Sequence, residues 1–136
     1  MTDKPFSDEA FSQRFSYSIS LGVNPMCLKV VAKGFGKPDD VLAMYEDIRQ
    51  HIKQDNLSNL LLDVKSLTLS YSGSDVVRVL HALETTLRVL NVARIVDLSD
   101  YKSDLIELFA SDHNISLKSF ISEQDALAWL RAQSQV

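Results

Sequence analysis

The chain has 136 residues, of which 46% are hydrophobic and 24% are charged, and its formal net charge is -4. These values are ordinary for one globular domain and exclude disordered and fibrous classes of protein. The acidic balance counts against a nucleic-acid-binding protein, because such domains usually carry a basic excess.

Targeting signals and cysteine content indicate the compartment. The first residues lack the apolar core of a secretory signal, and no run approaches the roughly 18 apolar residues that a spanning helix needs. Cys27 is the single cysteine of the sequence, so no intramolecular disulfide can form. We therefore expect a cytoplasmic protein without a membrane span.

The fold is predicted to begin with a hairpin. Residues 1–14 are polar and contain Pro5, so we expect a flexible N-terminal arm there. Residues 15–21 alternate between apolar side chains and serine, which is the pattern of a strand buried on one face only. A short turn leads to a second strand at residues 26–33, so the two strands should pair antiparallel, with the first at the edge of the sheet.

Strands and helices then alternate. Apolar residues at helical spacing follow Pro38 as far as a stop at Asp55 and Asn56. Further strands are predicted at residues 60–64, 92–97 and 115–121, with a loop from Lys65 to Ser70. The other helices run from the serine-rich turn to a cap near Asn91, around residues 105–109, and from Ser122 to about residue 131.

This order predicts a single α/β domain over residues 15–131, followed by a C-terminal tail at 132–136. Because strands and helices alternate through short links, we expect a five-stranded, mostly parallel mixed sheet with an N-terminal hairpin and four helices.

Two stretches resemble a known family. They are LLLDV at residues 60–64 with LTLSYSG at 67–73, and SFISEQDALAWL at 119–130. Together with the order of elements, they resemble the STAS and SpoIIAA-like fold of the anti-sigma-factor antagonists. In those antagonists a Asp-Ser-Ser-Gly turn carries a serine, just before the glycine, that a partner kinase phosphorylates.

The resemblance makes Ser72 the candidate phosphoacceptor, since it stands directly before Gly73. Ser70, Tyr71 and Ser74 replace the aspartate, first serine and following hydrophobic residue of the motif. The implied function is a non-enzymatic regulatory module that binds a protein partner, such as a kinase or an anti-sigma-like factor. The partner-binding turn would comprise Ser70, Tyr71, Ser72, Gly73, Ser74 and Asp75. Alternatively, Ser72 and Gly73 only form a turn, and Ser74 or Asp75 caps the helix.

A different function is also implied, because the SpoIIAA-like fold is similar in shape to lipid-carrying Sec14-type domains. A small apolar ligand or lipid would then occupy a pocket between Phe35, Tyr71, Leu105 and Phe109. The alternative is that these side chains fill the core or shield the interface of a homodimer.

The remaining candidates for chemistry are weak. Asp63 and Asp97 close two apolar strands and could hold a divalent cation, or they could simply accept hydrogen bonds from loop N–H groups. His51, His81 and His113 fall on separate elements without the spacing of a metal or triad motif. We therefore predict no metal site, no cofactor and no enzymatic activity.

Overall fold

The structure is a computed structural model that describes residues 14–100 and 102–134. The predicted N-terminal arm, apart from Arg14, lies outside the described residues, as do the last two residues of the predicted tail. None of the helices in the described ranges is both long and apolar enough to cross a membrane.

The order of elements confirms the predicted fold class. In chain order they are β1 (Ser16–Val23), β2 (Met26–Gly36), α2 (Pro38–Asp55), β3 (Asn59–Leu69), α3 (Gly73–Arg88), β4 (Asn91–Ile95), α4 (Lys102–Asp112), β5 (Ser116–Phe120) and α5 (Glu123–Ser134). The strands form one sheet in the order β1-β2-β3-β4-β5. The β1–β2 pair is antiparallel and the others are parallel, so β1 is an edge strand as predicted.

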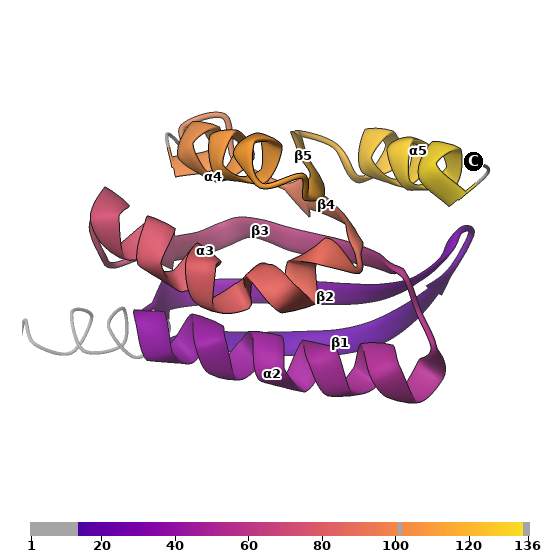
Figure 1. Cartoon of the computed structure of the whole chain (residues 1–136), viewed down its shortest axis with the longest axis horizontal. Helices are drawn as coiled ribbons and strands as arrows, with labels where there is room; N and C mark the ends of the chain where they lie inside the picture. Colours follow the sequence, from indigo (N-terminus) through magenta and orange to yellow (C-terminus); the bar gives the residue numbers. More distant parts are fainter. Residues whose placement is uncertain (1–13, 101, 135–136) are drawn as a thin grey trace, which may run out of the picture.

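The helices cover the two faces of the sheet unequally. From β2 to β5, each new parallel strand is added on the same side of the preceding one. Because such crossover connections are right-handed, the connecting helices α2, α3 and α4 all pack on one face of the sheet. Figure 1 shows α2 and α3 side by side in front of the strands. The last helix, α5, packs on the opposite face, where Ala126 and Leu130 contact a second, smaller cluster.

Successive side chains of β3 point to opposite faces of the sheet, so this strand contributes to both hydrophobic cores. Leu60 and Leu62 belong to the larger core beneath α2 and α3, whereas Leu61 belongs to the smaller core beneath α5. The consecutive apolar residues of this strand are therefore buried on both faces, as predicted.

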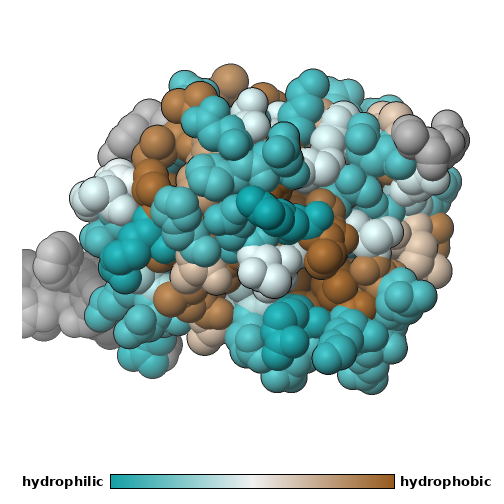
Figure 2. All heavy atoms as spheres, in the orientation of Figure 1, coloured by the Kyte–Doolittle hydropathy of each residue, from teal (hydrophilic) through white to brown (hydrophobic). Residues whose placement is uncertain are grey.

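The edge strand β1 is buried on one face only. Tyr17 and Ile19 pack against the larger core, while Ser16, Ser18 and Ser20 are exposed. On the side of the molecule drawn in Figure 2, hydrophilic residues cover most of the surface and hydrophobic residues reach it in patches.

The prediction of a loop from Lys65 to Ser70 is wrong for all of these residues except Ser70, because β3 extends to Leu69. β3 continues to Leu69 because the end of β2 continues beside it and pairs Gly34 with Leu67 and Gly36 with Leu69. Leu67 and Leu69 pack against the core, and the register shifts once upstream of this extension. The strand therefore carries the chain further than its run of consecutive apolar residues suggests.

The helix ends are only partly as predicted. α2 stops at a left-handed Asn56 with φ of 53°, which confirms the predicted stop. α3, however, ends at Arg88, and the predicted cap Asn91 lies in β4 opposite Asn59 and Ser116. From this position in the sheet, the side-chain amide of Asn91 donates a hydrogen bond to the buried Asn59. α5 runs to Ser134, so it includes part of the predicted tail.

Candidate functional site

The predicted partner-binding turn begins where β3 ends. The Ser70 backbone N–H donates to the Gly36 carbonyl at 3.0 Å, and the Ser70 hydroxyl donates to the same oxygen at 3.2 Å. These bonds hold the turn against the end of β2. A shallow depression runs from this turn to the first residues of α2, so the N-termini of α2 and α3 lie beside each other.

Ser72 is the N-cap of α3. Its hydroxyl oxygen accepts a hydrogen bond from the Asp75 N–H at 3.4 Å and lies 3.0 Å from the Ser74 hydroxyl. The cap is therefore Ser72 rather than Ser74 or Asp75. Ser72 is exposed, but its oxygen is 3.4 Å from a carboxylate oxygen of Asp75. A phosphate there would gain from the helix N-terminus and be repelled by Asp75.

The structure contains a small apolar cavity between the sheet and the helices, with a volume of about 50 Å³. Tyr71 lines it, together with residues of β3, α2 and α3. Of the other residues predicted for an apolar pocket, Phe35 is 44% exposed at the end of β2. Leu105 packs on the outside of the core, and Phe109 stacks on His113. The structure does not bring these four side chains together around the cavity.

Arg94 is a buried charge that the sequence analysis did not single out. It lies on β4 and points to the face covered by α3 and α4, where it is only 6% exposed. Its Nη1 donates to the Ser119 hydroxyl at 3.3 Å and to the Ser103 hydroxyl at 3.4 Å. Among the residues that the structure describes, no carboxylate forms an ion pair with it.

A polar pocket of about 210 Å³ opens beside Arg94 at the carboxyl ends of β3 and β4. We call it the Arg94 pocket; its lining residues are Val64, Lys65, Leu67, Thr68, Leu69, Arg94, Asp97, Ser99, Asp100 and Lys102. Arg94 lines both this pocket and the apolar cavity, as do Val64, Leu67 and Leu69. The guanidinium therefore lies at the junction of a polar opening and an apolar interior.

Burial dominates the electrostatics at this junction. It lowers the pKa of the Arg94 guanidinium, although Tyr45, Asp100, Glu107 and Tyr71 favour the charged form. The Glu107 carboxylate is itself engaged, since it accepts a hydrogen bond from the Ser119 N–H at 2.7 Å. Burial also raises the pKa of Tyr71 to about 12. The hydrogen-bond partners of Arg94 are thus neutral hydroxyls, while the carboxylates of Asp100 and Glu107 act on it from further away.

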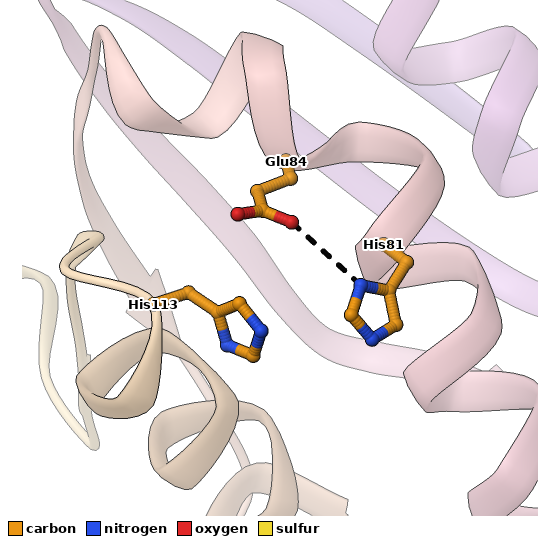
Figure 3. A group of neighbouring side chains, drawn as sticks. All are labelled: His81, Glu84 and His113. Atoms are coloured by element: carbon orange, nitrogen blue, oxygen red, sulfur yellow. Dashed lines mark ion pairs between the residues drawn. The ribbon is translucent and has the colours of Figure 1, made fainter.

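The strand-end aspartates have local roles. Asp63 accepts from the Lys65 N–H at 3.1 Å, and Asp97 accepts from the Ser99 N–H at 3.4 Å. These are the loop hydrogen bonds weighed as the alternative to a metal site. Two of the three histidines, however, come together: His81 of α3 and His113 after α4 lie beside Glu84 (Figure 3).

Sequence reasoning missed Arg94 and this histidine pair for different reasons. Arg94 could have been noticed as a charged residue inside the apolar strand sequence VARIV, where a cation needs a partner. His81 and Glu84 are three residues apart on one helix face, which is a weak local signal. Only the packing of α3 against α4 adds His113.

Comparison with known proteins supports the fold. No family model and no curated protein matches the chain. Among solved structures, it is similar to an uncharacterised protein of the DUF3478 family with a SpoIIAA-like fold from Shewanella loihica PV-4. The TM-score is 0.62 and the sequence identity 19%, over 86% of this chain and 95% of that chain. The chain therefore has a SpoIIAA-like fold, as its sequence resemblance predicted.

Proposed function

We propose that this chain is a non-enzymatic binding protein for a small organic anion, which Arg94 holds at the junction of the Arg94 pocket and the apolar cavity. The observation that carries the proposal is the buried guanidinium with two serine hydroxyls, and no carboxylate among the described residues, as its close partners. A buried charge without a carboxylate in direct contact is costly, so a ligand that supplies such a contact gains binding free energy.

Arginine suits this role because its planar guanidinium can bind both oxygens of a carboxylate or phosphate at once. Lys65 and Lys102 line the same pocket and offset the charges of Asp97 and Asp100, so Arg94 leaves the lining with a formal positive charge. The pocket also lies at the carboxyl ends of parallel strands, where open α/β sheets usually bind ligands.

The size of the apolar cavity limits the rest of the ligand. A volume of about 50 Å³ corresponds to fewer than two water molecules at about 30 Å³ each. Lipid and drug-sized ligands occupy pockets of several hundred Å³. The dimensions therefore favour a short-chain carboxylate over a Sec14-type lipid.

Thermal unfolding with added anions tests the proposal. Butyrate and inorganic phosphate at matched ionic strength are the probes, because they share an anionic group and only butyrate has an apolar tail. We expect butyrate to raise the melting temperature of the wild type more than phosphate does, since it also fills apolar space. Arg94→Gln should abolish the difference, and Lys53→Gln, on the exposed end of α2, should keep it.

The outcomes separate the alternatives. A larger effect of phosphate would assign the site to phosphorylated ligands. No effect of either anion, or equal effects on wild type and Arg94→Gln, would refute anion binding at Arg94. Native mass spectrometry of protein purified from its own host would test the lipid alternative, because a co-purified lipid would contradict the short-chain ligand.

A second candidate function is protein docking at the Ser70–Asp75 turn. Its support is the exposed Ser72 beside the joined N-termini of α2 and α3, where Lys37, Asp39 and Arg78 surround the shallow depression. An affinity pull-down with the wild type and with Ser72→Ala, combined with intact mass after incubation in extract, tests this function. If no protein is retained by the wild type and no serine-dependent phosphate is added, this candidate is rejected.

A further inference from the structure

The side chains of His81, Glu84 and His113 form a cluster that neither the fold nor the proposed anion site explains. His81 and Glu84 lie one turn apart on α3, and the Nδ1 of His81 is 3.6 Å from a carboxylate oxygen of Glu84. His113 follows the end of α4, which packs on α3. One ligand atom from each residue lies within 4.8 Å of the other two. Figure 3 shows the imidazole of His113 directed toward the other two side chains.

We propose that this His–Glu cluster binds a divalent transition-metal ion, for which Zn²⁺ is the best match. Two imidazole nitrogens and one carboxylate oxygen are a common zinc ligand set, with a fourth position left for water. The cluster shares no residue with the Arg94 pocket.

The orientation of His113 supports the proposal. Its Nδ1 lies 2.9 Å from the Phe109 carbonyl oxygen, which can only accept, so Nδ1 carries the proton and donates. Nε2 is then left with its lone pair, as a metal ligand requires. Histidines that bind metals usually donate their other ring N–H to a carbonyl or carboxylate in this way.

Aromatic packing holds the His113 ring in place and gives the more exposed His81 ring two ring contacts. Phe109 stacks on His113 with ring centroids 3.9 Å apart and 14° between the planes. The His81 ring is nearly perpendicular to both, with its centroid 4.9 Å from that of Phe109 and 5.2 Å from that of His113. The ligands are therefore partly pre-positioned before any ion binds, which reduces the entropy lost on binding.

The three ligand atoms need to move only a short distance to reach the spacing of a zinc site. Ligand atoms on a tetrahedral zinc are about 3.3 Å apart, given bonds of about 2.0 to 2.2 Å. The present separations are 3.6 Å for the His81–Glu84 pair and up to 4.8 Å in the cluster. The side chains of His81 and Glu84 are 56% and 22% exposed, so rotamer changes can close the difference. Arg88 pairs with the second oxygen of Glu84, which leaves the first one facing His81.

Zinc titration of the full chain, after removal of any tag and dialysis against chelator, tests the inference. We expect one equivalent of Zn²⁺ to bind and to raise the melting temperature. Loss of one ligand in Glu84→Gln or His113→Ala should weaken zinc binding by at least about tenfold. Even the loss of a residue that only hydrogen-bonds to a metal ligand typically weakens metal binding by about that factor. Glu84→Gln preserves the size of a helix-surface side chain, so it tests the site even if His113→Ala unfolds.

His51→Ala is the matched control. His51 also faces a carboxylate, Asp47, from one turn along an exposed helix at 3.4 Å. In the described part of the chain, no third histidine, cysteine or carboxylate lies close enough to complete a metal site with that pair. We expect His51→Ala to bind zinc like the wild type. Unchanged zinc affinity in Glu84→Gln, or a loss in His51→Ala equal to that in Glu84→Gln, would overturn the proposal.

Discussion

Arg94 illustrates how a single residue can oppose stability. Its side chain is buried on the face of the sheet covered by α3 and α4, with hydroxyl groups as its hydrogen-bond partners. Taking a cation out of water costs several kcal/mol, and two neutral hydrogen bonds recover only part of that cost. Residues that violate a folding rule in this way are typical of functional sites.

We predict that Arg94→Met does not destabilise the protein without ligand. The substitution removes the buried charge and keeps an unbranched apolar chain, so the free energy of unfolding should rise by about 1 kcal/mol. Urea unfolding measures it, and the same variant should lose the response to butyrate. Arg94→Lys, which keeps a buried charge, should be less stable than Arg94→Met. A loss above about 2 kcal/mol in Arg94→Met would mean that the guanidinium is structural.

Tyr71 should make the free energy of unfolding depend on pH in the alkaline range. Burial raises the pKa of its hydroxyl to about 12 in the folded protein, above the ordinary value of 10.0 that applies when the chain is unfolded. Between these values the unfolded chain loses the proton and the folded chain keeps it. The contribution of the protonated Tyr71 hydroxyl to the free energy of unfolding is therefore complete below about pH 10 and is lost as the pH rises toward about 12.

We predict that the free energy of unfolding falls over this window and that Tyr71→Phe reduces the fall. Urea midpoints at about pH 9, 10 and 11 measure it. Tyr45, whose pKa is also raised by burial, keeps part of the effect in the variant. An identical fall in wild type and Tyr71→Phe would show that Tyr71 ionises as freely in the folded protein as in the unfolded one.

At the scale of elements, the proposed docking turn connects the end of β3, which lines the Arg94 pocket, to the start of α3. Ser72 caps the helix, and Leu69, shortly before it, lines the Arg94 pocket. The Lys102 ammonium, from α4, also donates to the Leu69 carbonyl at 3.4 Å. A ligand in the pocket would therefore contact the strand end from which the turn begins.

We predict that Ser72→Ala lowers the free energy of unfolding by about 1 kcal/mol, because an N–H at the start of α3 loses its acceptor. Ser72→Asn should retain most of the stability, since asparagine is an equally good cap. Chemical denaturation of the two variants measures the difference. Equal stability of Ser72→Ala and wild type would show that Ser74 or Asp75 replaces the cap.

At the scale of the whole molecule, one sheet separates two cores of unequal size. The smaller core beneath α5 contains Cys27, which is 1% exposed, and Leu130, which is fully buried. Burial raises the pKa of the Cys27 thiol, so the reactive thiolate is disfavoured in the folded protein. Reaction of this thiol therefore reports how readily α5 leaves the sheet.

We predict that Leu130→Ala lowers the free energy of unfolding by about 2 to 5 kcal/mol and accelerates labelling of Cys27 by a thiol reagent. Leu98→Ala is the control, because Leu98 is 84% exposed and its truncation should change stability by less than about 0.5 kcal/mol. Stopped-flow labelling under native conditions compares the variants. Equal labelling rates would show that Cys27 becomes accessible without movement of α5.

The sequence by itself determined the elements and their order. The serine alternation of β1, the consecutive leucines of Leu60–Val64 and the helical spacing after Pro38 are local patterns, and each records which sides of one element are buried. Short links between such elements leave few topologies, so the mixed sheet with an edge hairpin followed. The resemblance of two stretches to the SpoIIAA-like group agreed with that order.

Only the tertiary structure decided which distant residues meet. The extension of β3 depends on pairing with the end of β2. The burial of Arg94 depends on α4, which packs beside β5 and brings the Ser103 hydroxyl to the guanidinium. His113 reaches Glu84 only because α3 and α4 are neighbours. These contacts join residues far apart in the chain, and periodicity within one element carries no information about them. For this reason the sequence predicted the framework of the protein, and packing between elements produced both candidate sites.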